Sequence, residues 1–278
     1  MRLSVIVLTH ERPDALALVL CGLARQREPP HEIVVTEDGA DPATRSAVEA
    51  HAPGLSCPVR HLSQEHRGPR MSRARNRGVA VASGEYVVFL DGDMVPGRDF
   101  VGDHSAMARA GCFVQGSRAL ASAALTAELL ARGRVDVGWL EPGLERRRHL
   151  IRQPLLRAAW GRPHQRRDGA KSCNLAFWRD DLVALNGFNE GMEGWGLEDA
   201  ELVQRAFHHG LRRRDLRMGG GAVHLWHPVS ALAADNPNWR VLRDVEARGV
   251  VRCAQGLAAH LDLSPPPLLN APRGPAAG

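Results

Sequence analysis

The N-terminal third of the chain alternates between short apolar runs and longer amphipathic stretches. Apolar runs rich in β-branched residues predict four buried strands, at Leu3–Leu8, Glu32–Thr36, Val59–Leu62 and Tyr86–Leu90. The amphipathic stretches between them predict three helices, at Pro13–Gln26, Pro42–His51 and Arg70–Ala82. The regular alternation of strand and helix is typical of an α/β protein.

This alternation predicts a Rossmann-like fold with a mainly parallel central sheet, right-handed crossovers and helices on both faces. In such sheets ligands bind beyond the carboxyl ends of the strands. Polar clusters follow three of the predicted strands, at Thr9–Glu11, Glu37–Asp38 and Asp91–Asp93. Because these strand ends meet at one edge of the sheet, we expect the clusters to form one ligand site.

Composition narrows the choice of partner. Apolar residues make up 44% of the 278 residues, which is enough for a sizeable core. The net charge is +5, and Lys171 is the only lysine, so the basic residues are almost all arginine. A basic surface suits anionic partners such as nucleotides or acidic lipids. The 31 acidic residues, without interleaved aromatic and basic residues, argue against nucleic-acid binding.

Cysteine usage and the N-terminus predict a cytoplasmic location. The five cysteines are scattered and have no zinc-site spacing, which is typical of a reducing compartment. Met1–His10 carries no signal-peptide pattern. The apolar run Ala15–Ala24 is too short to span a bilayer.

Asp91-Gly92-Asp93 places two carboxylates at the end of a predicted strand. Hard divalent cations prefer oxygen ligands, and a diphosphate needs a cation to offset its charge. The motif therefore indicates a metal site for a nucleotide diphosphate. The alternative is a plain turn, since Asp-Gly is a common turn pair.

Gly194-Trp195-Gly196-Leu197-Glu198-Asp199 opens a predicted helix. Acids in a first helical turn are favoured by the helix dipole, which stabilises their ionised form. An ionised carboxylate is what a general base needs to deprotonate a hydroxyl. The flanking glycines permit close approach of a ligand, and the Trp195 indole offers a face to a sugar ring. Simple dipole complementation is the alternative.

A histidine pair follows three glycines in Gly219–Pro228. His224 is a candidate to complete a metal site with Asp93. The alternative for each histidine is a structural role.

Two segments carry little pattern. Between Glu141 and Arg167, arginines bracket an apolar patch that includes Leu155 and Trp160, which predicts a mobile or surface-lying segment. It forms either an acceptor-binding loop, which we favour, or a peripheral contact with an anionic membrane leaflet. The Pro-, Gly- and Ala-rich tail after residue 262 predicts disorder.

These motifs resemble bacterial family 2 glycosyltransferases of the GT-A fold, in the subgroup with a galactosyltransferase-like C-terminal half. The likeness spans about residues 3 to 260 in the family's order, and it is carried by Val5–Pro13 with Glu37–Gly39, Gly68–Asn76 with Gly84–Asp93, Asn174–Arg179 with Gly187–Glu190 and Gly194–Asp199, and His224–Pro228.

The resemblance implies an inverting transfer of a sugar from a nucleotide-diphosphate donor to a hydroxyl of a glycan, glycolipid or glycoside. The nucleotide that it implies is UDP, which the family usually uses. It also implies one GT-A domain over residues 1–262, with a nucleotide-binding half at 1–115 and an acceptor-binding and catalytic half at 116–262. Residues 263–278 form the predicted tail. The sequence indicates neither the sugar nor the oligomeric state.

The resemblance further implies roles for individual residues. The implied nucleotide-binding residues are Thr9, Glu11, Asp38, Arg70, Arg73, Arg75 and Asp91. The implied ligands of Mn²⁺ or Mg²⁺ are Asp93 and His224, with Asp91 nearby, and His227 is expected to close a turn. Asp199 is implied as the base, Glu198 as a contact to sugar or acceptor, and Trp195 and Gly196 as the walls of the acceptor pocket.

Two other function classes compete with this interpretation. Asp91–Val95 also fits the nucleophile loop of haloacid-dehalogenase-like phosphatases, but that loop follows the first strand, and here two strand–helix units precede it. A degenerate transferase that only binds nucleotide-sugars would lack metal or base residues. Asp93, His224, Glu198 and Asp199 are all present.

Overall fold

The computed structural model describes residues 1–228 and 232–270, and of residues 158–160 it describes the backbone alone. The strands are β1 Leu3–Thr9, β2 Glu32–Glu37, β3 Val59–Ser63, β4 Tyr86–Asp91, β5 Met94–Pro96, β6 Cys112–Gln115, β7 Ala119–Ala121, β8 Leu144–Glu145, β9 Asn174–Trp178, β10 Arg212–Asp215 and β11 Ala222–His224. The α-helices are α1 Pro13–Ala24, α2 Pro42–His51, α3 Met71–Val81, α4 Phe100–Met107, α5 Ala123–Arg132, α6 Pro154–Trp160, α7 Arg179–Leu185, α8 Glu198–His208 and α9 Asn238–Arg248. Short 3₁₀ helices are η1 Ala52–Gly54, η2 Arg147–Leu150 and η3 Leu257–His260.

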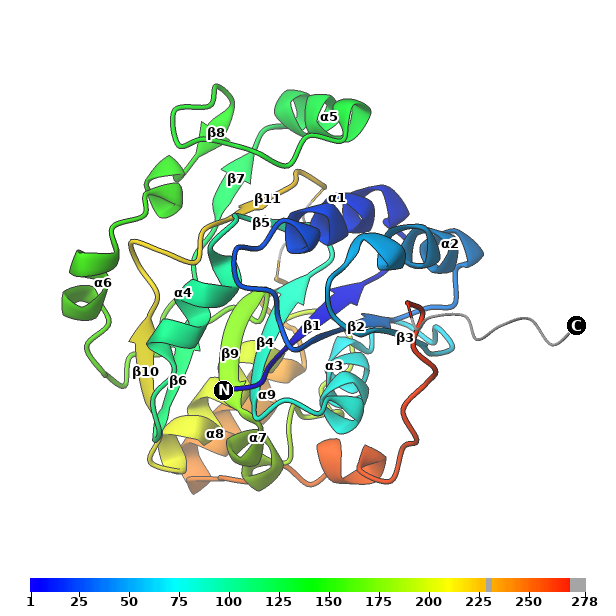
Figure 1. Cartoon of the computed structure of the whole chain (residues 1–278). Coiled ribbons are helices and arrows are strands. Elements are labelled where there is room, and N and C mark those ends of the chain that lie inside the picture. The colour runs from blue at the N-terminus through cyan, green and yellow to red at the C-terminus, as the bar shows by residue number, and fades with distance from the viewer. Residues whose placement is uncertain (229–231, 271–278) are drawn as a thin grey trace, which may run out of the picture.

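A seven-stranded sheet forms the centre of the molecule, in the order β10-β6-β9-β4-β1-β2-β3 (Figure 1). β1 pairs in parallel with β2 and β4, and β2 pairs in parallel with β3. β9 runs antiparallel to its neighbours β4 and β6. The sheet is mixed but mainly parallel, which confirms the predicted fold class.

Side chains of β1 alternate between two cores, because successive residues of a strand point to opposite faces. Val5 and Val7 lie in the core that α1 and α2 cover, whereas Ile6 lies in the core that α3, α7 and α8 cover. Figure 1 shows these two groups of helices on opposite sides of the sheet. Burial on both faces explains why the central strands are continuous apolar runs.

Local signals set the helix bounds close to the predicted ones. α2 begins as expected, with Pro42 in its first turn and the side chain of Asp41 accepting a hydrogen bond from the Ala43 amide at 3.0 Å. α1 ends at Ala24, before the predicted Gln26. The Gln26 side chain instead donates to the carbonyl oxygens of Gly22 and Gly97, at 3.0 and 2.8 Å.

A second sheet, in the order β5-β11-β7-β8, lies beside the first (Figure 1). β5 starts directly after Asp93 and pairs antiparallel with β11, so that His224 lies opposite Met94. The Leu225 amide donates to the Asp93 carbonyl at 2.9 Å. This register brings the end of β11 next to the Asp-Gly-Asp turn.

The segment between residues 141 and 167 is tied to the body of the protein. It contains β8, η2 and α6. The buried carboxylate of Asp103 in α4 accepts hydrogen bonds from Arg152, Arg157 and the Gly220 amide. Farther along, His164 bridges to Arg213 of β10. The segment for which the sequence predicted mobility or a surface position is therefore anchored by a buried carboxylate.

The predicted tail begins at residue 263, and its first part is ordered against the edge strand β3. The side chain of Asn270 accepts from the Val59 amide at 3.1 Å and donates to the Cys57 carbonyl at 2.7 Å. Residues 263–270 therefore depart from the predicted disorder, and residues 271–278 lie outside the described residues. Among the described helices, none is long and apolar enough to cross a membrane.

Candidate active site

A cavity of about 350 Å³ opens at the carboxyl ends of β1, β2 and β4, and we call it the strand-end cavity. Its lining includes Thr9, Asp38, Asp91 and Asp93 from the three polar clusters, and Trp195, His224 and His227 from the C-terminal half. The polar clusters thus share one cavity, and residues more than one hundred positions away in the sequence complete it.

Arg75 of α3 joins the Asp-Gly-Asp turn to the start of α8. Its Nη2 lies 3.1 Å from Asp91 Oδ1, and its Nη1 lies 3.4 Å from Glu198 Oε1. Burial alone would lower the pKa of Arg75, but the two carboxylates outweigh burial and the pKa is raised. Arg75 is therefore a buried, permanently charged bridge.

Asp93, His224 and His227 form a group with the character of a metal site. His224 Nε2 lies 3.5 Å and His227 Nε2 lies 3.3 Å from Asp93 Oδ2. One potential ligand atom from each residue lies within 4.8 Å of the other two. Among the described residues, these three form the one group of potential metal ligands that are this close together. The expected pair of Asp93 and His224 is thus together, with a third potential ligand that the sequence interpretation left out.

The protonation states of Asp93 and His224 fit metal binding. Burial, and then the charge of Arg118, lowers the pKa of His224 to about 3. Burial, and then the charge of Asp91, raises the pKa of Asp93 to about 6. At neutral pH the imidazole is uncharged and the carboxylate ionised, as ligation requires. Two imidazoles and a carboxylate suit a transition ion better than Mg²⁺, which prefers oxygen.

Asp38, another lining residue of the strand-end cavity, is fixed by hydrogen bonds. Its Oδ1 accepts from Gln64 Nε2 at 2.8 Å, and its Oδ2 accepts from the Arg70 amide at 2.5 Å. The Arg70 guanidinium turns away to the Glu65 carbonyl. Nearby, the buried Thr9 Oγ1 has no hydrogen-bond partner among the described residues. Asp38 and Thr9 thus offer a fixed acceptor and an unsatisfied hydroxyl to a ligand.

Three of the predicted nucleotide contacts do not line this cavity. Glu11 has a positive φ of 46°, and 73% of its side chain is exposed. Burial alone would raise the pKa of Glu190, but hydrogen bonds from His260 and Asn76 lower it, and the charge of Arg73 adds to this lowering, so Arg73 lies near Glu190. Residues two apart on a helix project about 200° apart. Only one of Arg73 and Arg75 therefore faces the cavity, and it is Arg75; Arg70 turns away as described.

A second cavity of about 300 Å³ lies at the start of α8, and we call it the helix-start cavity. Trp195, Gly196, Glu198 and Asp199 line it, and Trp195 lines both cavities. Gly196 has φ +103°, and a Cβ there would lie 2.7 Å from Leu232 Cδ1. The positive φ favours glycine at the turn into α8, whereas the Leu232 side chain could move aside for a Cβ.

Glu198 and Asp199 are adjacent but differently engaged. Glu198 is buried against Arg75. Asp199 accepts from the Ala200 amide at 2.7 Å and from the Ser172 amide at 3.4 Å. Burial, and then the charge of Glu198, raises the pKa of Asp199 to about 6. Burial and Glu198 thus outweigh the expected stabilisation of the ionised carboxylate by the helix start. With a pKa of about 6, Asp199 is still mainly ionised at pH 7.

The sequence interpretation missed several residues of these cavities. His227 was expected to close a turn, and its Nδ1 does lie 2.8 Å from the Pro228 carbonyl, but its Nε2 faces Asp93. His10 lines the strand-end cavity and stacks on His66, with ring centroids 4.7 Å apart. Lys171 lines the helix-start cavity. For His227, the spacing of three residues from His224 was the sequence feature that could have indicated a second histidine ligand.

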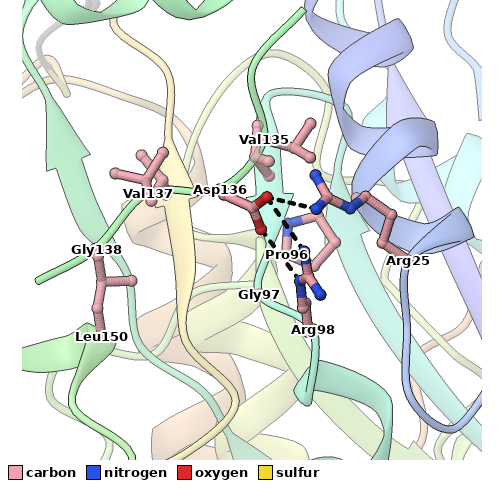
Figure 2. Close-up of a pocket in the computed structure, with 12 residues that line it drawn as sticks. Arg25, Pro96, Gly97, Arg98, Val135, Asp136, Val137, Gly138 and Leu150 are labelled. Atoms are coloured by element: carbon pink, nitrogen blue, oxygen red, sulfur yellow. Dashed lines mark hydrogen bonds and ion pairs between the residues drawn. The ribbon is translucent and has the colours of Figure 1, made fainter.

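Another cavity, of about 300 Å³, contains none of the predicted site residues (Figure 2). Figure 2 shows Asp136 pointing toward Arg25 and Arg98, and its Oδ1 lies 3.2 Å from Arg98 Nε. Because the charged groups of this cavity pair with one another, we assign it a structural role.

Comparison with known proteins identifies two family regions. A family model described as glycosyl transferase family 2 matches residues 4–166, and one described as the N-terminal domain of galactosyltransferase matches residues 158–228. The validoxylamine A glucosyltransferase of Streptomyces hygroscopicus subsp. limoneus is 28% identical over 229 residues, which cover 75% of this chain and 48% of the relative. The chain thus spans about half the length of this relative.

Solved structures show the same fold at low sequence identity. TarS 1–349 of S. aureus in complex with UDP-GlcNAc has a TM-score of 0.59 and 17% identity, over 94% of this chain and 69% of that one. The mannosyltransferase PcManGT of Pyrobaculum calidifontis, in complex with GDP-Man and Mn²⁺, has a TM-score of 0.52 and 20% identity, over 88% and 61%.

Proposed function

The chain belongs to glycosyl transferase family 2 and has the GT-A fold, and on that premise we propose that it transfers a hexose from a UDP-sugar to an acceptor hydroxyl, with inversion at the anomeric carbon. The observation that carries the proposal is the shared strand-end cavity, which joins Asp38, Arg75 and the group of Asp93, His224 and His227. The acceptor class we propose is a glycan, glycolipid or glycoside.

In this proposal the strand-end cavity holds the nucleotide. Asp38 and Thr9 receive the base and ribose, because both offer polar atoms at the strand ends. Arg75 orients Asp91 toward the ribose or a water molecule on the cation. The cavity draws on residues from both the 1–115 and the 116–262 regions, so we propose that residues 1–262 act as one catalytic unit.

We propose Mn²⁺ as the cofactor, held by Asp93 and His224 together with His227. When bound, the ion would offset the negative charge of the leaving diphosphate. The structural neighbour PcManGT was solved with Mn²⁺. The two imidazoles favour Mn²⁺ over Mg²⁺ at this position.

Asp199 is the proposed base, which removes the proton of the acceptor hydroxyl. Glu198 is bound to Arg75, whereas the hydrogen bonds that Asp199 accepts come from neutral backbone amides. Since successive helical residues project about 100° apart, one carboxylate faces the hydroxyl. A single displacement needs no second carboxylate as covalent nucleophile, and it inverts the anomeric centre. Trp195 and Gly196 form the wall between donor and acceptor.

A screen of purified protein against nucleotide-sugars tests this function. We expect one UDP-sugar to raise the melting temperature when Mn²⁺ is present and much less when it is absent, because only the folded state binds the complex. Turnover of that sugar nucleotide, read as released UDP, would separate an enzyme from a degenerate binding protein. Release of phosphate from phosphomonoesters with Mg²⁺, without any response to nucleotide-sugars, would support the phosphatase alternative and contradict the proposal.

We also propose that the enzyme is cytoplasmic and, as the second role open to the 141–167 segment beside the favoured acceptor-binding one, that α6 rests on an anionic membrane surface. Leu155 is 94% exposed and Leu156 is 50% exposed, and three arginines at 146–148 precede them in the chain. Figure 1 shows α6 at the periphery of the molecule. Exposed leucines beside arginines suit an interface with acidic lipid headgroups.

Co-sedimentation with vesicles tests the membrane proposal. We expect binding to vesicles that contain phosphatidylglycerol at low salt, and little binding to phosphatidylcholine alone. The double substitution Leu155→Asp and Leu156→Asp should abolish it. Leu261→Asp, at a leucine that is 40% exposed elsewhere, is the matched control and should retain binding. Equal sedimentation of both variants would contradict a contact through α6.

A further inference from the structure

A fourth cavity, of about 250 Å³, borders the candidate active site and is rich in basic residues; we call it the basic cavity. Asp168, Gly169 and Lys171 line both this cavity and the helix-start cavity that contains Asp199. On its other side, Arg118 donates to Cys173 Sγ at 2.9 Å, and the Cys173 carbonyl accepts from the Asp91 amide at 3.3 Å. The basic cavity therefore adjoins both the proposed base and the Asp-Gly-Asp turn.

Positive charge in the basic cavity is not balanced by its own carboxylates. Its cationic residues are Arg118, Arg146, Lys171, Arg213 and Arg217. Its two carboxylates are Asp168 and Asp215. Asp215 pairs with two of the arginines, at 2.7 Å from Arg213 Nε and 3.4 Å from Arg217 Nη2. Within residues 1–228 and 232–270, no carboxylate lies within 4.0 Å of the charged groups of Arg118, Arg146 or Lys171. An excess of cations is thus left facing one cavity.

Two further observations indicate a place for an oxyanion. The buried Nε of Arg118 has no hydrogen-bond partner among the described residues, and a thiol is a weak acceptor for the rest of its guanidinium. A buried donor without an acceptor is unfavourable, so a ligand oxygen would stabilise it. Burial lowers the pKa of His149, and the charges of Arg148, Arg146 and Arg217 lower it further. The electrostatic potential at His149, in the wall of the cavity, is therefore positive.

The walls of the basic cavity include the segment that carried no sequence motif. Arg146 and His149 come from that segment, while Arg213 and Arg217 come from β10 and the turn after it. The bridge between His164 and Arg213, together with the anchoring of Arg152 by Asp103, holds the segment against the body. The segment thus closes a cavity next to the proposed base, which is where an acceptor is selected.

We propose that the acceptor carries an anionic group, a phosphate ester or a carboxylate, and that the basic cavity binds this group while the acceptor hydroxyl reaches Asp199. The inference rests on the proposed function, because Asp199 defines the acceptor side. The diphosphate of the donor belongs to the strand-end cavity, where Asp93, His224 and His227 lie. The charge of Arg118 also reaches Asp93 and His224, and Lys171 also lines the helix-start cavity. Arg146 and Arg217 line the basic cavity alone and are therefore the cations available to a second anion.

Binding of simple probes, measured by calorimetry with saturating UDP and Mn²⁺, tests the proposal. Saturation with UDP keeps the probes out of the strand-end cavity. Glucose 6-phosphate represents a phosphate ester, glucuronate a carboxylate, and glucose the neutral form. We expect one of the two anions to bind at least about tenfold more tightly than glucose, since charge-assisted hydrogen bonds are the strong ones. The tighter anion identifies the chemistry, and equal affinity for all three probes would overturn the proposal.

Matched variants locate the binding. Arg146→Gln with Arg217→Gln removes two cations of the basic cavity, and we expect it to weaken the anion about tenfold while UDP affinity changes less than about twofold. The control, Arg45→Gln with Arg248→Gln, removes the same charge from arginines that are 71% and 70% exposed on α2 and α9, and it should bind the anion normally. Equal weakening in both double variants would refute a local site.

Donor hydrolysis without acceptor separates this proposal from the proposed function. If the protein hydrolyses a nucleotide-sugar and the anions bind no better than glucose, only the anionic acceptor is refuted. If an anion binds through Arg146 and Arg217 but no nucleotide-sugar is bound or turned over, the cavity is confirmed as an anion site and the proposed function is refuted.

Discussion

Asp199→Asn is expected to lower kcat by about two to four orders of magnitude while the affinity for donor is retained. Asparagine keeps the shape of the side chain but cannot accept the proton of the acceptor hydroxyl. Turnover with a matched donor and acceptor, and UDP binding by calorimetry, measure the two quantities separately. Asp180→Asn is the control, because Asp180 is also an acid in the first turn of a helix, α7, but is exposed and lies outside both cavities.

The pH profile supplies a second readout of the same residue. Because the pKa of Asp199 is raised to about 6 and the base acts in its ionised form, kcat should be full above about pH 7 and fall as the pH drops through 6. Saturating Mn²⁺ keeps Asp93 deprotonated, so its own titration does not contribute. The remaining kcat of Asp199→Asn should not fall as the pH drops through 6.

Glu198→Gln distinguishes the two neighbouring acids. Glu198 is buried against Arg75, so its neutralisation should disturb the bridge to Asp91 and weaken donor binding more than the chemical step. Near-normal turnover in Asp199→Asn, with loss of kcat alone in Glu198→Gln, would assign the base to Glu198. A product that retains the anomeric configuration would refute the single-displacement mechanism.

Asp93→Ala is expected to abolish the dependence of UDP binding on Mn²⁺, with a loss of at least about a hundredfold in affinity for the metal. Asp93 is the carboxylate that both histidines face, at 3.5 and 3.3 Å, so its removal leaves the two imidazoles without an anionic co-ligand. Calorimetric titration of UDP with and without Mn²⁺ measures the effect.

Two comparisons make the result at Asp93 specific. Asp136→Ala removes a carboxylate from the cavity in Figure 2, and it should leave the Mn²⁺ dependence unchanged. His224→Ala and His227→Ala should each weaken Mn²⁺, since both rings face Asp93. A normal Mn²⁺ response in His227→Ala would restrict the metal site to Asp93 and His224, as the sequence alone suggested. If UDP binding by Asp93→Ala depends on Mn²⁺ as in the unsubstituted protein, the metal-site assignment is refuted.

The strand–helix units of the N-terminal third were predictable because each signal is local. β1, β2 and β4 lie on continuous apolar runs, and α2 begins at the predicted Pro42. The Asp-Gly-Asp motif follows β4 directly, so its place at the edge of the sheet depends only on the direction of that strand. The family was recognisable for the same reason, since its motifs are short and lie in a set order.

Contacts between distant parts of the chain were decided by the tertiary structure. Asp93 and His227 meet because β5 and β11 pair in one antiparallel register, which no local pattern encodes. The choice of Arg75 over Arg73 depends on which face of α3 packs toward the cavity. The pKa of Asp199 depends on burial and on Glu198, which outweigh the local effect of the helix start. Local sequence thus determined the elements and the chemistry that they carry, whereas strand pairing and burial determined which groups meet and in which charge state, because both arise only when distant segments exclude water together.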